Sequence, residues 1–179
     1  MNFPLPACFL AVPLDDPARE VFRTLENHLG DDYARTLSFQ NPDSPHLTLY
    51  YWDSVMEIEY NRIITQAEKI AEATEPFELK LSGVNTFAGK HGDRVLYLDV
   101  PFSEPLARLK KKCPWPSLQP FHPHVTLARI RHPQRFAVVK KDVLKILENP
   151  VIQTHVDRLC LYAEIDGKKQ TLLQEFSFF

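Results

Sequence analysis

The sequence has 179 residues, enough for one domain with a sizeable core or for two small lobes. Its apolar fraction of 44% and charged fraction of 25% are ordinary for a globular protein, and no apolar run approaches the length of a transmembrane helix. A net charge of −2 argues against non-specific coating of nucleic acid, so any anionic ligand needs a local patch of positive charge. The three cysteines lack metal-type spacing and the N-terminus lacks an early basic cluster, which together predict a cytoplasmic protein with reduced thiols.

Hydrophobic periodicity predicts strands and helices that alternate along the chain. Short apolar or alternating runs predict strands over residues 8–12, 36–39, 45–51, 77–81, 94–100, 124–127, 154–163 and 170–176. Amphipathic spacing predicts helices over residues 17–29, 55–74, 104–112 and 133–147. Strands joined by hairpins, with helices between them, favour an α+β fold with antiparallel sheets over a doubly wound parallel sheet.

Cap and turn residues predict two of the boundaries. Asp16, just before Pro17, is the expected N-cap of the first helix. The turn residues of 89–93 are expected to join the strands over 77–81 and 94–100 into a hairpin.

A four-residue motif occurs once in each half of the chain, as His46-Leu47-Thr48-Leu49 and as His124-Val125-Thr126-Leu127. In a β-strand, residues i and i+2 point to the same face. The histidine and threonine of each copy should therefore stand side by side, while the apolar residues anchor the strand to a core. With helices and hairpins repeating around the two copies, the sequence predicts a pseudo-two-fold duplication with a two-sided site.

Two histidines that face each other can act at once, one as general base and one as general acid, because the pKa of imidazole lies near neutrality. Threonine hydroxyls between them suit the non-bridging oxygens of a phosphate. Such a site can hydrolyse a phosphodiester in line without a metal, a cofactor or a covalent intermediate. Glycine-rich phosphate loops, His-Glu-x-x-His and Gly-x-Ser-x-Gly, which would indicate other chemistry, do not occur in the sequence.

Two other groups of residues have alternative interpretations. His122, His124 and His132 have a spacing that suits zinc, but no cysteine or carboxylate nearby completes the set, so no metal is expected. Arg108 and the lysines of 110–112 are interpreted as a charge cluster at the end of a helix, with a grip on RNA as the alternative.

The two motifs, at this separation in a chain of this length, resemble those of the two-histidine (2H) phosphoesterase superfamily. Residues 120–129, Pro-Phe-His-Pro-His-Val-Thr-Leu-Ala-Arg, resemble the branch of RNA 2′,3′-cyclic phosphodiesterases and 2′-5′ RNA ligases, as do residues 9–12 and 94–98. The resemblance implies a single bilobal domain over residues 1–179, in which two antiparallel sheets with outer helices face each other across a central cleft.

The resemblance also implies a role for each site residue. His46 would donate a proton to the leaving 3′ oxygen, and His124 would accept a proton from water, which leaves a 2′-phosphate. Thr48 and Thr126 would hold the phosphate oxygens. Arg129 would add charge nearby, although strand alternation puts it on the face opposite His124.

The implied partners are RNA ends, or small nucleotides, that carry a 2′,3′-cyclic phosphate, and the reverse 2′-5′ joining is a second implied reaction. The resemblance implies no cofactor, no metal and no membrane, and a monomer is the default. Two alternatives stay open: a phosphodiesterase for small cyclic nucleotides or 2′-5′ oligoadenylates, and a non-catalytic module that binds nucleotides or RNA. The presence of both histidines counts against the second.

The chain departs from the family pattern after the first motif, where Phe-Leu-Gly is usual and Tyr50-Tyr51-Trp52 stands here. In a regular strand Tyr50 and Trp52 share the face of the motif histidine and threonine. Together with Phe9 they are candidates for stacking against a nucleotide base, with ordinary packing as the alternative. The departure leaves the preferred nucleotide open.

Overall fold

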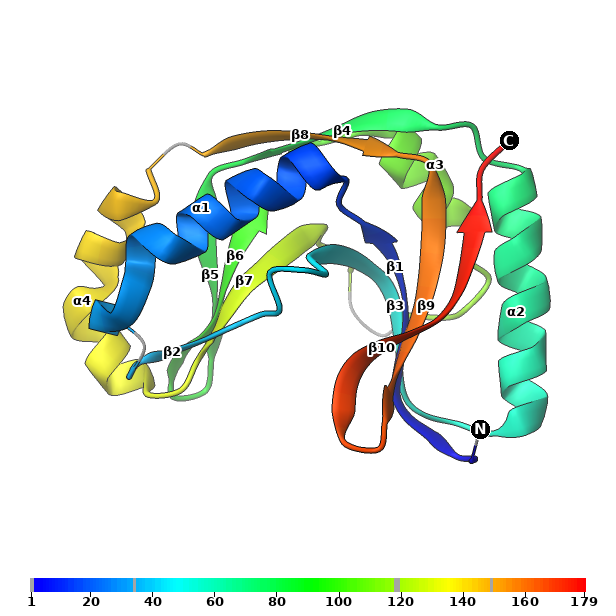
Figure 1. Ribbon diagram of the computed structural model, residues 1–179, viewed down its shortest axis with the longest axis horizontal. Helices are drawn as coiled ribbons and strands as arrows, with labels where there is room; N and C mark the ends of the chain where they lie inside the picture. Colours follow the sequence, from blue (N-terminus) through cyan, green and yellow to red (C-terminus); the bar gives the residue numbers. More distant parts are fainter. Residues whose placement is uncertain (1, 34, 118–119, 149) are drawn as a thin grey trace.

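The computed structural model describes residues 2–33, 35–117, 120–148 and 150–179 (Figure 1). These residues form the helices α1 (Asp16–Tyr33), α2 (Glu57–Glu72), α3 (Glu104–Lys112) and α4 (Pro133–Ile146). They form the strands β1 (Leu5–Pro13), β2 (Leu37–Phe39), β3 (His46–Val55), β4 (Phe77–Ser82), β5 (Val84–Gly89), β6 (Gly92–Asp99), β7 (His124–Ile130), β8 (Val151–Val156), β9 (Arg158–Ile165) and β10 (Lys168–Ser177). Among the described residues, no helix is long and apolar enough to cross a membrane.

The strands form two antiparallel sheets. The larger has eight strands in the order β10-β9-β1-β3-β7-β6-β5, with β2 also paired to β7, and the smaller consists of β4 and β8. In Figure 1, β10, β9, β1 and β3 stand on one side of the molecule with α2 outside them. β5, β6 and β7 stand on the other side with α4 outside them, and β4 and β8 run between the two sides. The predicted α+β class and bilobal arrangement with outer helices are confirmed.

The two halves of the larger sheet meet where the two motif strands touch. Among the described residues, β3 and β7 share one register pair, Leu47 with Val125, and both side chains are fully buried. Because the pairing is antiparallel, the residues that flank this pair turn to the opposite face, and each motif histidine lies toward the threonine of the other motif. The pairing of two apolar residues thus places both histidines and both threonines on one side of the sheet.

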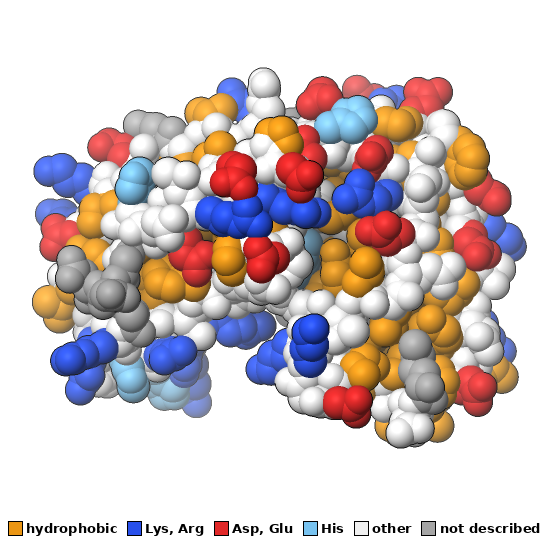
Figure 2. Space-filling model, viewed as in Figure 1, with side chains coloured by type: hydrophobic (Ala, Val, Ile, Leu, Met, Phe, Trp, Pro, Cys, Tyr) orange, Lys and Arg blue, Asp and Glu red, His pale blue; other side chains and the backbone are white. Residues whose placement is uncertain are grey.

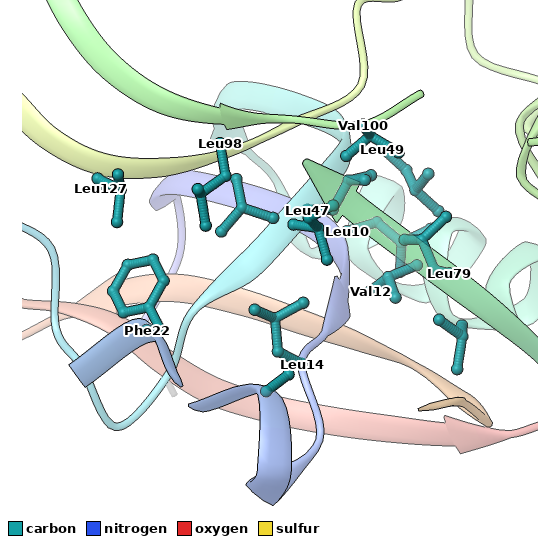
Figure 3. Packing of buried hydrophobic residues seen from close by; sticks show 14 of the residues in the cluster. Leu10, Val12, Leu14, Phe22, Leu47, Leu49, Leu79, Leu98, Val100 and Leu127 are labelled. Atoms are coloured by element: carbon teal, nitrogen blue, oxygen red, sulfur yellow. The ribbon is translucent and has the colours of Figure 1, made fainter. Parts of the chain in front are cut away.

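The hydrophobic core holds this junction from the other side. Leu47 belongs to a buried cluster that includes Leu10 of β1, Leu98 of β6 and Phe22 of α1 (Figure 3). Each of these four side chains has no exposed surface. Since truncation of such a leucine to alanine typically costs about 2–5 kcal/mol, the core fixes the junction, and with it the direction in which the motif residues point.

The N-terminus of α1 is capped by Asp15, so the prediction of Asp16 as the N-cap is wrong. The Asp15 Oδ1 atom accepts a hydrogen bond from the amide of Ala18 at 3.0 Å, and Oδ2 accepts one from the amide of His155 at 2.8 Å. The amide of Asp15 in turn donates to Thr154 Oγ1 at 3.0 Å. Asp15 is preferred because its carboxylate binds the helix and β8 at the same time, which the local sequence does not reveal.

The predicted hairpin of residues 77–81 with 94–100 is wrong. β4 pairs instead with β8, and a strand that the sequence did not predict, β5, forms the hairpin with β6. Gly83 lies between β4 and β5 with a φ of 82°, a left-handed conformation that favours glycine, and it lets the chain leave one sheet and enter the other. The strand predicted over residues 154–163 is likewise divided, at Asp157, between the two sheets.

Candidate active site

A pocket of about 130 Å³ lies between the two motif strands. It is lined by Phe9, Gln40, Pro45, His46, Thr48, Tyr51, His124, Thr126, Arg129 and Gln170. The four motif residues predicted from the sequence are therefore brought together, as are the predicted candidates Phe9 and Arg129. Figure 2 shows the molecular surface indented between the two halves, with Lys and Arg side chains on both sides of the indentation.

β3 contains a bulge just after its motif threonine. Thr48 pairs with Ala11 of β1, but the next pair along β3 is Tyr50 with Leu10, so Leu49 is an extra residue. An extra residue exchanges the two faces of the strand from that point on. Tyr51, paired with Phe9, therefore faces the pocket. The expectation that Tyr50 and Trp52 share the face of the motif residues is wrong, because it assumed a regular strand.

Tyr50 and Trp52 form an aromatic cluster and do not line this pocket. Their ring centroids lie 4.6 Å apart, and Trp115 lies 4.9 Å from Trp52 and 5.6 Å from Tyr50. The Tyr50 hydroxyl donates a hydrogen bond to the carbonyl oxygen of Pro116 at 2.7 Å. The cluster thus holds the proline-rich segment after α3 against β3.

β7 contains a bulge at the equivalent position of the second motif. Thr126 pairs with Tyr97 of β6, but Ala128 pairs with Leu96, so Leu127 is the extra residue. The shift brings Arg129 onto the face of the motif residues, where it lines the pocket. The expectation that Arg129 lies on the face opposite the motif histidine is therefore wrong, while its inclusion among the site residues stays a prediction about function.

Each motif histidine is held by the backbone in the same way. His46 Nδ1 lies 2.8 Å from the carbonyl oxygen of Ser44, and His124 Nδ1 lies 2.8 Å from that of His122. A carbonyl oxygen only accepts hydrogen bonds, so in each ring the Nδ1–H group donates. The other nitrogen, Nε2, is then the atom that gains or loses a proton.

The environment of both histidines disfavours their charged forms. Burial lowers the pKa of His46, and the nearby His124 lowers it further, against the opposing effect of the hydrogen bond to Ser44. Burial also lowers the pKa of His124, as does His122 beside it, while the hydrogen bond to the His122 carbonyl and the carboxylate of Asp99 act in the opposite direction. In the free protein both rings are therefore neutral at neutral pH.

Aromatic rings enclose the two imidazoles in different ways. Phe9 and Tyr162 stack nearly parallel on His46, with centroids at 4.8 Å and 5.6 Å. On the other side, Phe87 and Tyr97 approach His124 at 4.8 Å and 5.4 Å with steeply inclined planes. The sequence did not indicate that Tyr162, Phe87 and Tyr97 lie next to the histidines, because β9 and the β5–β6 hairpin come near the motif strands only through the order of strands in the larger sheet.

Two glutamines from opposite halves of the molecule meet at the pocket. Gln170 Nε2 donates a hydrogen bond to Gln40 Oε1 at 2.9 Å, and Ser44 Oγ donates to Gln170 Oε1 at 3.3 Å. Gln170 has a φ of 58°, a conformation that is uncommon for residues other than glycine, asparagine and aspartate. A chain of contacts therefore connects Gln40 through Gln170 and Ser44 to His46. The sequence carried no signal for either glutamine.

In the part of the chain that the structure describes, no three His, Cys, Asp or Glu side chains come together in an arrangement suited to a metal ion.

An antiparallel α+β fold with paired His-x-Thr strands facing one pocket defines a two-histidine phosphoesterase. A model of the 2′-5′ RNA ligase superfamily matches residues 13–168, and the chain belongs to this family. The resemblance inferred from the motifs is thus confirmed, and with it the expectation of an enzyme that acts on phosphoric ester bonds.

Relatives named for an activity on RNA are found at moderate identity. The RNA 2′,3′-cyclic phosphodiesterase of Bacillus subtilis is 27% identical over 136 residues, which cover 69% of this chain and 71% of that protein. The enzyme of the same name from Methanothermobacter thermautotrophicus is 27% identical over 133 residues, which cover 70% and 72%. The crystal structure of E. coli LigT in its apo form is 21% identical with a TM-score of 0.72 over 99% of both chains, and so has the same fold.

Proposed function

We propose that the protein is a metal-independent RNA 2′,3′-cyclic phosphodiesterase that opens the cyclic phosphate to a 2′-phosphate. The observation that carries the proposal is the paired geometry of the two histidines. Each presents Nε2 as its titrating nitrogen, because each Nδ1–H group is bound to the carbonyl two residues earlier. Both line one pocket with both motif threonines.

The proposed reaction uses one histidine as base and the other as acid. His124 Nε2 accepts a proton from water, and the water oxygen attacks phosphorus from the side opposite the 3′ oxygen. The bond between phosphorus and the 3′ oxygen breaks, and His46 Nε2 gives its proton to that oxygen. The division of roles between the two rings follows the resemblance of the motifs to those of the family.

The other pocket residues compensate the charge that builds up on phosphorus. The hydroxyls of Thr48 and Thr126 lie on either side of the junction between β3 and β7, where they donate to the non-bridging oxygens. Arg129 adds a positive charge at the same pocket. Binding of the phosphate anion raises the pKa of His46, which supplies the acid with the proton that the free ring lacks.

The relatives support RNA ends or small nucleotides as substrates. Two of them are named RNA 2′,3′-cyclic phosphodiesterases. E. coli LigT, which has the same fold, has been solved in complex with 3′-AMP.

The proposal is tested by product analysis on a short RNA that ends in a 2′,3′-cyclic phosphate, with and without EDTA. We expect a 2′-phosphate end to form in both conditions. His46→Ala and His124→Ala should each lower kcat by at least about 100-fold, since a positioned acid or base contributes about 10²–10⁴. Nucleotide affinity should stay within a few-fold, which separates an enzyme from a binding module. Retained turnover in either variant, a 3′-phosphate product, or loss of activity in EDTA would contradict the proposal.

A further inference from the structure

Two glutamine side chains join the two sides of the molecule at the pocket. Gln40 follows β2, which pairs with β7, whereas Gln170 lies in β10 on the opposite side (Figure 1). Both line the pocket, and Gln170 Nε2 donates a hydrogen bond to Gln40 Oε1 at 2.9 Å. The pair therefore connects the side that carries the second motif with the side that carries the first.

The hydrogen bonds continue from this pair to both motif strands. On one side, the backbone amide of Gln40 donates to the carbonyl oxygen of Leu127, the bulge residue of β7, at 2.9 Å. On the other side, Gln170 Oε1 accepts from Ser44 Oγ at 3.3 Å, and the Ser44 carbonyl accepts from His46 Nδ1 at 2.8 Å. One chain of hydrogen bonds thus runs from the second motif strand to the imidazole of the first.

The backbone at Gln170 has a conformation that disfavours glutamine. Its φ of 58° lies in the left-handed region, where a Cβ atom comes too close to the following carbonyl oxygen. It stands at an irregularity of β10, where the register against β9 shifts between Lys168 and Thr171. Glycine and asparagine adopt this conformation more readily. A glutamine held there indicates that the side chain is needed at this place.

The carboxamide of Gln170 suits both of its neighbours. Its nitrogen donates to Gln40 and its oxygen accepts from Ser44, so both ends of one group are used. Asparagine would fit the backbone but is one methylene shorter. A carboxylate would keep the acceptor for Ser44 and lose the donor for Gln40.

We propose that Gln170 is a positioning residue, which fixes the orientation and the tautomer of His46 through Ser44. The inference rests on the proposed function, in which His46 Nε2 gives a proton to the 3′ oxygen. Because Gln170 holds Ser44 Oγ, the Ser44 carbonyl stays in place to accept the Nδ1–H group of His46. The ring then presents Nε2 to the pocket, as its role in the reaction requires.

The opposite histidine is supported by other residues. His124 Nδ1 donates to the carbonyl of His122, whose own ring lies 3.5 Å from the carboxylate of Asp99. Loss of the Gln170 side chain should therefore disturb His46 and leave His124 as it is.

The pH dependence of kcat should report this effect. Burial lowers the pKa of His46, and the hydrogen bond to the Ser44 carbonyl opposes this. A variant that loosens Ser44 should lower the pKa of His46 further. Since the acid must carry its proton in the complex, the alkaline limb of the kcat profile should move to lower pH by about 0.5–1 unit, as for the loss of one hydrogen bond. Such a variant keeps the other titratable groups that line the pocket or stack on His46, which are Tyr51, His124, Arg129 and Tyr162.

Gln170→Gly removes the side chain and suits the left-handed backbone. It should lower kcat for a 2′,3′-cyclic phosphate about tenfold, as expected for a misplaced acid, and leave KM within about threefold. The alkaline limb should move as described. The melting temperature should stay within about 3 °C of the wild type, because relief of the backbone offsets the two lost hydrogen bonds.

Two further variants separate positioning from other roles. Gln170→Glu keeps the acceptor for Ser44, so it should retain kcat within about threefold without moving the alkaline limb to lower pH, while its charge raises KM for the anionic substrate. Gln174→Ala replaces another glutamine of β10, which is half-buried and does not line the pocket. It should leave kcat, KM and the pH profile unchanged.

The imidazole ¹⁵N chemical shifts of His46 give a readout that does not depend on turnover. In the wild type we expect the signals of a neutral ring that is protonated on Nδ1. In Gln170→Gly the signals of His46 should move to those of a mixture of tautomers, while those of His124 stay as in the wild type.

The outcomes separate the role of Gln170 from the reaction itself. A wild-type pH profile and an unchanged His46 tautomer in Gln170→Gly would refute the positioning role. A raised KM with unchanged kcat would refute it too, since Gln170 would then contact the substrate directly, and so would an equal loss of kcat in Gln170→Glu. If the wild type does not open the cyclic phosphate, the proposed function falls, while the tautomer of His46 still decides the role of Gln170.

Discussion

Arg129 gives the sharpest test of the site, because its position depends on a single bulge residue. In a regular strand Arg129 would point away from His124, and its replacement would leave catalysis unchanged. The register of β6 and β7 makes Leu127 an extra residue and turns Arg129 into the pocket. Arg129→Met keeps most of the side chain's length and removes the charge, so it measures the contribution of that charge to the reaction.

The expected loss follows from the exposure of the guanidinium. Hydrogen bonds to charged groups contribute about 1.5–3 kcal/mol, and we take the lower end because the side chain of Arg129 is exposed and screened by water. A loss of about 1.5 kcal/mol corresponds to a decrease of about tenfold in kcat/KM. The loss should shrink as the ionic strength rises, since added salt screens the charge in the wild type.

The assay is kcat/KM for an RNA that ends in a 2′,3′-cyclic phosphate, measured at low and high salt. Arg131→Met is the matched control, because Arg131 is an exposed arginine two positions further along whose guanidinium donates a hydrogen bond to Ser38 Oγ at 3.2 Å. It should change kcat/KM by less than about twofold, in line with a charge outside the pocket. Unchanged kcat/KM in Arg129→Met, or an equal loss in both variants, would refute the assignment.

Three further predictions concern the pH dependence and the scaffold. Burial lowers the pKa of both motif histidines, and the proposed reaction requires one neutral and one charged ring. The pH–rate profile of kcat/KM should therefore be bell-shaped with its optimum below about 6.5, and an optimum above about 7 would contradict the role of burial. Leu47→Ala should lower the free energy of unfolding by about 2–5 kcal/mol in urea denaturation, whereas Leu172→Ala, at a side chain that is 47% exposed, should lower it by less than about 0.5 kcal/mol. Asp15→Ala should lower the free energy of unfolding by about 1–2 kcal/mol and Asp16→Ala by less than about 0.5 kcal/mol, as measured by thermal unfolding; the reverse order would refute Asp15 as the cap.

The sequence predicted the parts of the site that depend on local pattern. The His-x-Thr spacing placed each pair on one face of a strand, and the apolar residues between them, Leu47 and Val125, are the pair at which the two halves join. The structure adds the reason why the two copies meet: both apolar residues are fully buried in one core, so the polar residues beside them are forced to the same side.

The sequence did not predict what depends on the partner strand. A bulge adds one residue and reverses the faces of everything that follows it, and whether it forms is decided by the register against a neighbouring strand. In β7, two consecutive apolar residues, Leu127 and Ala128, are both buried, which is a local sign that the alternation changes there. In β3 no such sign exists, because tyrosines stand at both positions after the bulge residue Leu49.

The two bulges also explain how a nearly symmetric pair of strands can serve the asymmetric reaction that we propose. Each bulge residue follows the motif threonine directly, and it brings the residue two positions further on into the pocket: Tyr51 in the first half and Arg129 in the second. Backbone hydrogen bonds hold both imidazoles alike, so the histidines themselves do not define a direction. Their surroundings differ, because nearly parallel stacked rings close the pocket beside His46 while a groove of about 540 Å³ opens beside His124. In the proposed reaction, the leaving oxygen stays attached to its ribose and therefore suits the closed side, whereas the attacking water comes from solvent and suits the open side.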